Sequence, residues 1–545
     1  MAIDPIGFRG SMHTKVPSAR PSSRPKPTVC HPSTDTFMGS SPVNPFRNAG
    51  VNTPQRTVGH MEVAALSLKT AVHSPQVPDT VDEARAVIRA EALKAATPNI
   101  VHHLPLEDRA DVLNYAAAKA EQAVALFDEL YEVVKPAERR HLPREDAQAA
   151  EGEAVAEAWK AYQVLTAGGL PGAIPATGSA VVEQAMAETE ALVANATAMR
   201  PELKELVVAK ILQGTDSLET TLSTELGNAL GVRFPALQGF YGEQFHQFSE
   251  AFRASIGLVG AGLMQDSPDV STPLATLGSL RERFDAAQLD VRVAAGFADA
   301  EAGLDAFGIV LDDTSAEADW TDVRREYVLA QAIRIENALR AADTDALLSR
   351  FAAGEAFDAL FATRGDITLR LVDEGLDGGG ITRNSALIEF RTFSNANRWD
   401  GMANAFQYHI AHEFGHALNA SMHNAYEALG LHDEANLKPY NTIDDERLPD
   451  ASARQWNDAA WGLPVRDVDG LAVAQPYQQN RSATDGEYFA DVFANWANGT
   501  LLDNEAGRAL EVWMGEMTPE WIHARLEASH LIDPPGTQTG VPEHN

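Results

Sequence analysis

The sequence predicts an α+β protein in which a long, mainly helical region precedes a smaller domain that contains strands. Between residues 79 and 350, apolar residues recur mostly at helical spacing. After about residue 360, short segments rich in β-branched and aromatic residues replace that pattern. The chain has 545 residues and is 45% hydrophobic, which is enough to form several cores. We therefore expect a leader (1–60), a helical region (61–300), a C-terminal domain (301–532) and a flexible tail (533–545).

The first sixty residues differ from the rest in charge and in proline content. They carry seven Lys or Arg against two Asp or Glu, and nine of the 29 prolines. Such a segment buries too little apolar surface to offset its backbone entropy, so we expect disorder. It would serve as a leader, a partner-binding arm or a plain linker. The start, MAIDPIGFRGSMHTKV, has no apolar core typical of a secretory signal peptide. We expect synthesis in the cytoplasm, and export by a specialised secretion system as a toxin or effector stays open.

Charge and cysteine content exclude several classes of function. The formal net charge of −34 argues against a general nucleic-acid binder, which needs a basic surface. No apolar run reaches the roughly 18–20 residues that span a bilayer. The single cysteine, Cys30, excludes an internal disulfide and an all-cysteine metal site. The sequence does not specify the oligomeric state.

The helical region begins with a capping box. Thr80-Val-Asp-Glu83 precedes an Ala/Glu/Leu-rich helix that we expect to reach about Ala95. Further helices are expected over 106–134, 144–166, 179–213, 235–255 and 316–350, with a break at GGLPGAIPATG (168–178). The pair His102-His103 falls in a loop-like stretch, and no catalytic cluster is recognisable in 61–300.

Two strands are expected in the C-terminal domain. ITLRLVD (Ile367–Asp373) and ALIEFRTF (Ala386–Phe393) have strand composition, and GLDGGG (375–380) lies between them. The glycine run lacks the Gly-Lys-Ser/Thr ending of a phosphate-binding loop, so we interpret it as a connection.

A metal-binding motif follows the second strand. His412-Glu413-Phe414-Gly415-His416 is an H-E-x-x-H sequence. On a helix, residues i and i+4 lie about 40° apart in angle and about 6 Å apart along the axis, so two imidazoles converge on one ion. Glu413 lies beside the metal without ligating it and can take a proton from water there. The apolar residues at helical spacing form one arc beside the histidines: Met402, Phe406, Ile410, Phe414, Ala417 and Leu418.

The third metal ligand has three candidates. His423 falls one residue late for H-E-x-x-H-x-x-G-x-x-H, in which Asn419 stands at the glycine position and Met422 at the third histidine. Glu487 and Asp491 form E-x-x-x-D on one helical face, with Ala490 and Ala494 beside them. We prefer Glu487 as ligand. Asp491 would instead accept the far N–H of a ligand imidazole, expected to be that of His412, although it is itself a candidate ligand.

Together, HEFGHAL and EYFADVFANW resemble the gluzincin family of zinc metallopeptidases. The nearest likeness is to the catalytic domain of anthrax lethal factor and related bacterial toxin-type zincins, over about residues 360–500. The resemblance implies a zincin-like domain with Zn²⁺ held by His412, His416 and Glu487, and Glu413 as general base. It also implies that the strand 386–393 aligns the substrate. Seventy residues lie between His416 and Glu487, more than in that family, so 424–480 falls outside the resemblance.

A tyrosine that helps to stabilise the oxyanion is implied by the same family. Tyr477 is preferred because it lies ten residues before Glu487, on an expected loop. Tyr440 and Tyr488 are alternatives. Asp467-x-Asp469-Gly470 resembles part of a calcium loop but lacks the later glutamate, so a turn is expected.

The function expected from the sequence is zinc-dependent hydrolysis of a peptide bond in a protein or peptide substrate. The alternative is a helical interaction protein with an inactive zincin-like domain. An intact Glu413 argues against the alternative, because an inactive site has no need to keep its base.

Overall fold

The structure is a computed structural model, and the residues it describes belong to one compact unit of the chain, Val58–Asn545. The described residues are 77–97, 101, 105–136, 143–169, 177–265, 267–317, 319–362, 365–373, 380–392, 403–431, 485–501 and 505–530. The predicted leader, the predicted tail, His102-His103 and the Asp467–Gly470 turn lie outside them.

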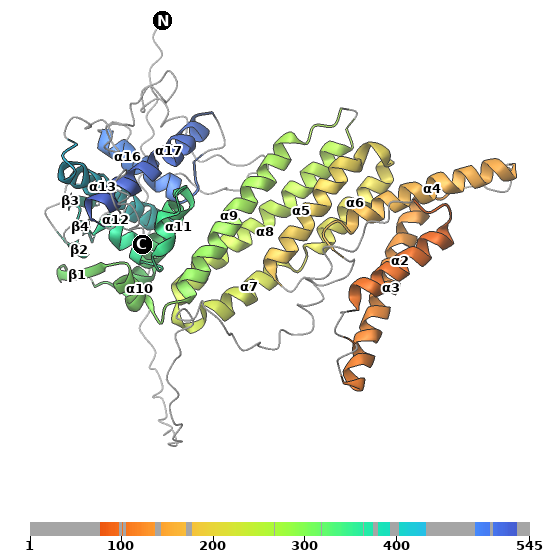
Figure 1. Ribbon diagram of the computed structural model, residues 1–545, viewed down its shortest axis with the longest axis horizontal. Helices are drawn as coiled ribbons and strands as arrows, with labels where there is room; N and C mark the ends of the chain where they lie inside the picture. Colours follow the sequence, from red (N-terminus) through yellow and green to blue (C-terminus); the bar gives the residue numbers. More distant parts are fainter. Residues whose placement is uncertain are drawn as a thin grey trace, which may run out of the picture. The chain divides into compact units, whose positions relative to one another are not determined.

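Eight α-helices form the described part before residue 300. They are α2 (Val81–Ala96), α3 (Leu106–Val134), α4 (Arg144–Leu165), α5 (Gly178–Asn195), α6 (Pro201–Gly214), α7 (Leu218–Ala229), α8 (Pro235–Leu263) and α9 (Ser271–Ala295), with short 3₁₀ turns at Ala196–Ala198 and Gly231–Arg233. Helices α5 to α9 pack side by side (Figure 1). The N-cap of the predicted capping box is confirmed, since the Thr80 hydroxyl accepts the N–H of Glu83 at 3.2 Å. The Glu83 carboxylate accepts the N–H of Asp79, one residue before the N-cap.

The prediction of a single helix over 179–213 is wrong. The chain forms α5 and α6, separated by a 3₁₀ turn and an extended Arg200. Pro201 causes the break, because a proline disfavours helical conformation in the residue before it and suits the first position of a new helix.

The C-terminal part combines helices with one small sheet. Its helices are α10 (Ala300–Ala306), α11 (Asp322–Ala342), α12 (Glu355–Phe361), α13 (Ala403–Ala428), α16 (Asp485–Ala497) and α17 (Glu505–Ala528), with a 3₁₀ turn at Leu347–Arg350. Its strands are β1 (Ile309–Ser315), β2 (Ile367–Val372), β3 (Gly380–Asn384) and β4 (Leu387–Arg391). The helix expected over 316–350 is shorter, since α11 begins at Asp322, where the Thr321 side chain caps it, and ends at Ala342.

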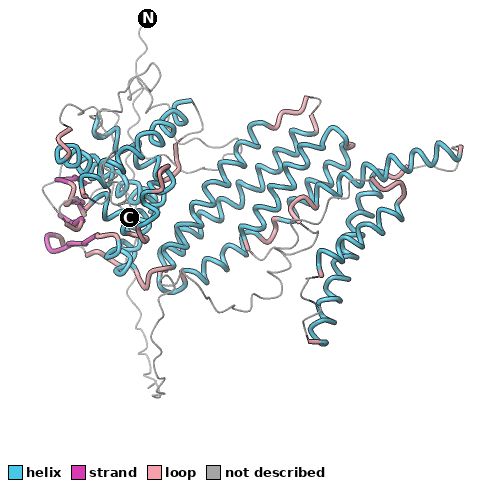
Figure 2. Tube along the Cα trace, viewed as in Figure 1, coloured by secondary structure: helices cyan, strands magenta, loops and turns pink. Residues whose placement is uncertain are grey.

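The sheet is mixed, with the order β1-β2-β4-β3. Strand β1 runs parallel to β2 and β2 parallel to β4, while β3 and β4 form an antiparallel hairpin. Figure 2 shows the four strands together in magenta. Two predictions about the sheet are corrected. Strands β1 and β3 were not predicted from the sequence, and β3 begins at Gly380, the last residue of the glycine run. Strand β4, expected to be the substrate-aligning edge, lies inside the sheet, and the described edge beside α13 is β3.

The two faces of the sheet differ in chemistry. Leu369, Ile388 and Phe390 are fully buried on one face. The other face carries a row of ion pairs in which Arg370 contacts Asp312 at 2.7 Å and Glu389 at 3.6 Å. This alternation fixes the register of each strand, because a slip by one residue would exchange the two faces.

Helix α13 lies at the centre of the C-terminal part, in contact with α11, α12, α16, α17 and β3. The predicted apolar arc is confirmed at the four members whose side chains are described, since Ile410, Phe414, Ala417 and Leu418 are at most 1% exposed. One continuous hydrophobic core runs through the described residues on both sides of residue 300. No helix among the described residues is long and apolar enough to cross a membrane.

Candidate metal centre

Three side chains from two helices converge on one point. His412 and His416 come from consecutive turns of α13, and Glu487 comes from the first turn of α16. One ligand atom from each lies within 4.8 Å of the others. The predicted pairing of the H-E-x-x-H helix with the E-x-x-x-D helix is therefore present.

Helix packing brings Glu487 to the histidines. Gly415 lies between the two histidine turns, and a Cβ atom there would lie 2.9 Å from Cα of Ala490 and 3.3 Å from Cβ of Phe493. A glycine facing an alanine lets α13 and α16 approach closely. Phe489 of α16 packs edge-on against Trp513 and Trp521 of α17, which holds α16 in place.

The spacing of the three donor atoms fits a zinc ion. Nε2 of His412 lies 3.2 Å from Nε2 of His416 and 3.1 Å from Oε2 of Glu487. Nε2 of His416 lies 3.5 Å from the same oxygen. Ligands of a tetrahedral zinc ion, with bonds of about 2.0–2.1 Å, lie about 3.3 Å apart. Two imidazoles and one carboxylate are also a ligand set that zinc uses in catalytic sites.

Asp491 fixes the orientation of the buried histidine. Its Oδ1 lies 2.8 Å from Nδ1 of His412, and both side chains are buried. The contact predicted between these two residues is confirmed. In neutral His412, this contact places the proton on Nδ1 and leaves a lone pair on Nε2. That lone pair then faces a carboxylate oxygen of Glu487, an arrangement that a cation between them makes favourable.

Electrostatics at the centre reflect the same arrangement. Burial lowers the pKa of His412, but the hydrogen bonds to Asp491 and Glu487 outweigh it and raise the pKa to about 10. The hydrogen bonds to His412 and His416 hold the pKa of Glu487 well below its usual range. The centre thus concentrates negative charge around the imidazole nitrogens, which favours a bound cation.

Glu413 lies next to the three donors and is only 2% exposed. Its Oε2 accepts the hydroxyl proton of Thr382 at 2.8 Å, and its Oε1 lies 3.4 Å from Nε2 of His409. Burial raises the pKa of Glu413, but the contact with His409 and the charges of the neighbouring imidazoles outweigh it, so the pKa is lowered. The carboxylate is therefore ionised at neutral pH and can accept a proton.

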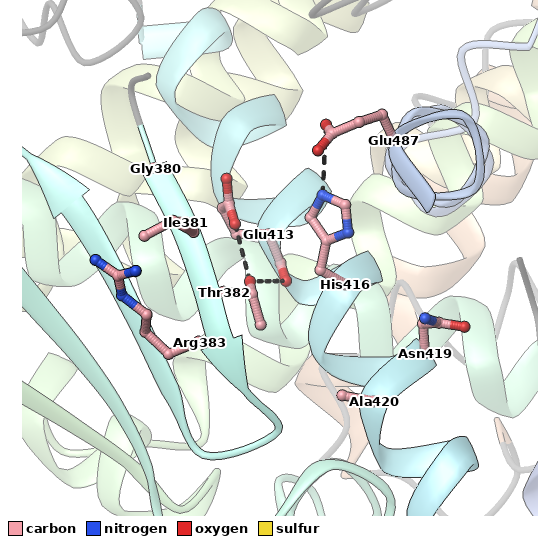
Figure 3. Close-up of a pocket in the computed structure, with 9 residues that line it drawn as sticks. All are labelled: Gly380, Ile381, Thr382, Arg383, Glu413, His416, Asn419, Ala420 and Glu487. Carbon is pink, nitrogen blue, oxygen red and sulfur yellow. Dashed lines mark hydrogen bonds and ion pairs between the residues drawn. The ribbon is translucent and has the colours of Figure 1, made fainter. Parts of the chain in front are cut away.

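A cleft of about 350 Å³ opens onto these groups. It is lined by β3 on one side and by α13 and Glu487 on the other (Figure 3). His412 is fully buried, whereas the side chains of His416 and Glu487 are 21% and 36% exposed. The ligand set is thus closed toward the core and open toward the cleft, so a metal there keeps a position for water or substrate.

Several other residues singled out in the sequence lie elsewhere. His423 is two turns along α13 from His416, and its Nε2 lies 3.1 Å from Glu427, so it does not join the centre. Asp491 contacts the far side of His412 and does not belong to the converging group. Tyr477 and Tyr440 lie outside the described residues, as does the side chain of Tyr488.

Sequence reasoning missed three residues at the site: Gly380, Thr382 and His409. His409 could have been found, because it lies three residues before His412 and therefore near the same helical face. Gly380 and Thr382 could not, because Gly380 was interpreted as the end of a connection and no strand was expected over 381–384. No protein-family model, curated protein or solved structure matches the chain. Function is therefore inferred from the residues themselves.

Proposed function

We propose that the chain is a zinc-dependent peptidase of the glutamate-zincin type. The observation that carries the proposal is the convergence of His412, His416 and Glu487, with Glu413 beside them in the wall of an open cleft. The Asp491 carboxylate behind His412 adds support, because outer partners of this kind orient metal-ligating histidines.

Each residue has a separate role in the proposed reaction. His412, His416 and Glu487 would hold the zinc ion, which supplies polarisation of the scissile carbonyl and a lowered pKa of water. Glu413 accepts a proton from the attacking water on its carboxylate and returns it to the nitrogen of the leaving amine. Asp491 keeps the Nδ1 proton of His412 in place, so that Nε2 faces the cleft side as a ligand.

Strand β3 is suited to align an extended substrate. Among the described residues it pairs only with β4, and its residues Gly380 to Arg383 line the cleft. A peptide added along this edge forms backbone hydrogen bonds, which give affinity without demanding one side-chain sequence. A protein or peptide is therefore the substrate class that we propose.

A second candidate function is interaction rather than catalysis. Helices α2 to α9 contribute no described residue to the cleft lining, so much of the chain is free to serve in contacts with a partner. In that case the metal centre would be structural or inactive. An ionised Glu413 in the cleft wall favours the peptidase.

One experiment distinguishes the peptidase from the interaction protein. Wild type and Glu413→Gln, both loaded with zinc, are incubated with a peptide library, and the products are identified by mass spectrometry. We expect cleavage by wild type and a loss of about 10²–10⁴-fold in Glu413→Gln with zinc retained, because a base and not a ligand is removed. His423→Ala, altered on the same helix outside the centre, should cleave like wild type. Equal cleavage by wild type and Glu413→Gln would reject Glu413 as base, and no cleavage by wild type would favour the interaction protein.

A further inference from the structure

Strand β3 touches the carboxylate of Glu413 through two alternate residues. The hydroxyl of Thr382 lies 2.8 Å from Oε2 of Glu413 and 3.0 Å from its backbone oxygen. Gly380, two residues earlier, lies beside Oε1 of the same carboxylate. Residues i and i+2 of a strand share a face, so both contacts come from the side of β3 that faces α13.

The opposite side of β3 does not take part in this contact. Arg383 pairs with Glu389 of β4 at 2.8 Å, on the face that carries the ion pairs of the sheet. Figure 3 shows Thr382 turned toward Glu413 and Arg383 turned away from it. The register of β3 therefore decides that a hydroxyl, and not the guanidinium, meets the carboxylate.

Glycine at position 380 is what allows the close approach. A Cβ atom there would lie 2.7 Å from Oε1 of Glu413 and 3.0 Å from Nε2 of His409. Both distances are shorter than real Cβ contacts tolerate without movement of a neighbour. With glycine, the strand backbone fits against the carboxylate, and Thr382 reaches hydrogen-bond distance.

Glu413 is thus held at both oxygens. Thr382 donates to Oε2, while Gly380 and the buried ring of His409 enclose Oε1. The ring of His409 is itself fixed, because it packs edge-on against Phe390 of β4 with 5.5 Å between ring centroids. A carboxylate held in this way loses little freedom when it accepts a proton, which is the kind of preorganisation that general bases need.

We propose that Thr382 is a positioning residue for Glu413, and that Gly380 provides the space in which the Thr382 hydroxyl can hold the carboxylate. The inference rests on the proposed function, in which Glu413 is the general base. It adds that the edge strand proposed to align the substrate also fixes the base. A shift of β3 would therefore misplace substrate and base together.

The test uses four variants of the full chain, each loaded with zinc. Thr382→Val removes the hydroxyl at nearly constant volume, and Thr382→Ser retains it. Gly380→Ala adds the methyl group that collides with Oε1. Thr392→Val is the matched control, because Thr392 donates to the backbone oxygen of Val372 in the same sheet and does not contact Glu413. Zinc content, kcat and KM are measured for each, and crystal structures of the zinc-loaded proteins give the position of the Glu413 carboxylate.

We expect all four variants to hold one zinc ion. Thr382→Val should lower kcat by about 10–100-fold with KM within about twofold, and Gly380→Ala should lower kcat by a similar factor. Thr382→Ser and Thr392→Val should stay within about threefold of wild type. A merely structural role for Thr382 would not give this split between kcat and KM or the rescue by serine. Unchanged kcat in Thr382→Val, or a raised KM with kcat retained, would overturn the inference.

The crystal structures keep the inference separate from the proposed function. If wild type holds zinc but cleaves no peptide, the proposed function fails. The inference is then tested by the position of the Glu413 carboxylate alone. The carboxylate should be displaced or adopt alternative conformations in Thr382→Val and remain in place in Thr382→Ser. A carboxylate that is unmoved in Thr382→Val would overturn the inference whatever the activity.

Discussion

His412 is held from both sides of its ring. Nδ1 contacts Asp491 at 2.8 Å and Nε2 contacts Glu487 at 3.1 Å, while the side chain is fully buried. Burying an imidazole between two carboxylates is costly unless a positive charge compensates them. A proton on His412 or a metal ion at Nε2 provides that charge. A metal ion would satisfy more of the site, because it would also engage His416, whose Nε2 lies 3.2 Å from Nε2 of His412.

Glu487, Asp491 and His423 lie at increasing distances from the proposed metal position, which predicts an order of zinc affinity for their variants. Asp491→Ala should weaken zinc binding by about 10–100-fold, because it removes only the outer partner of His412. Glu487→Ala should weaken it more, because it removes one of three ligands. His423→Ala should match wild type, since its side chain contacts Glu427 instead. Competition with a zinc-chelating dye measures all three. Loss of the metal in His423→Ala with Glu487→Ala unaffected would require a different ligand set.

The sequence predicted the candidate ligands and Asp491 on the two helices, but not His409. Ligand geometry on one helix depends on local spacing, so H-E-x-x-H predicted that His412 and His416 converge, and E-x-x-x-D predicted that Glu487 and Asp491 share a face. The meeting of the two helices was expected from the paired motifs and the family resemblance, not from local spacing. Thr382 was missed because its role comes from contact between a strand and a helix 31 residues away. Such tertiary contacts leave no periodic signal in the chain.

The crossing of α13 and α16 determines whether the centre exists. Two of the candidate ligands come from one helix and the third from the other, so the distance between the helices sets the spacing of the donor atoms. Gly415 and Ala490 are the residues at the closest approach. The expectation that alanines on α16 permit such packing is confirmed at Ala490, and the facing glycine is part of the motif itself.

Replacing Gly415 should therefore impair the metal centre without touching a ligand. In Gly415→Ala the added Cβ lies 2.9 Å from Cα of Ala490, and a backbone atom cannot move aside locally. The helices must separate, so we expect zinc affinity to fall by at least about 10-fold and unfolding free energy to fall by about 1–3 kcal/mol. Zinc competition and urea denaturation measure the two effects.

Gly278→Ala in α9 is the matched control. A Cβ atom there has no neighbour within 4 Å, so it should leave zinc binding unchanged and stabilise the helix slightly. Wild-type zinc affinity in Gly415→Ala would show that zinc binding tolerates a larger distance between α13 and α16 than we expect.

At the level of elements, helices were easier to predict than strands. The expected spans 106–134 and 144–166 agree with α3 and α4 to within a residue, because long amphipathic patterns with clear breaks specify helices locally. Strands β1 and β3 were missed, because IVLDDTS and GITRN are short and polar and are stabilised by pairing with β2 and β4. The edge position of β3 is likewise a property of the whole sheet.

Across the whole molecule, α11 connects the helical part to the metal-centre part. Its Glu326 accepts the backbone N–H of Leu237 at the start of α8 at 2.9 Å. Its Arg334 pairs with the buried Asp290 of α9 at 2.7 Å. Helix α11 also contacts α13 and α16. The helix that supports the centre is therefore also held by α8 and α9.

One buried acid makes the stability of the molecule depend on pH. Glu188 on α5 is 4% exposed, and burial raises its pKa to about 8 against a weaker opposing hydrogen bond from Gln184. The pKa is higher in the folded state, so the folded state retains the proton longer. The stability that this group contributes is complete below about pH 4.5 and is lost as pH rises through about 8.

Glu188→Gln should remove this dependence. At pH 9 the variant should be more stable than wild type by about 3–5 kcal/mol, and at pH 4.5 the two should be nearly equal. Glu190→Gln, an exposed position on the same helix, is the control for loss of one charge from the acidic chain. Urea denaturation across this pH range measures the difference. Parallel curves for wild type and Glu188→Gln would show that folding does not raise the pKa of Glu188.

The most direct measurement is the zinc content of the purified full chain before and after chelation. Metal analysis should find one zinc ion per chain, removed by a strong chelator and restored by dialysis against zinc. His412→Ala and His416→Ala should each hold none after the same dialysis, because each removes one of three converging ligands. A wild-type chain that takes up no zinc, or variants that retain a full equivalent, would contradict the assignment of this centre.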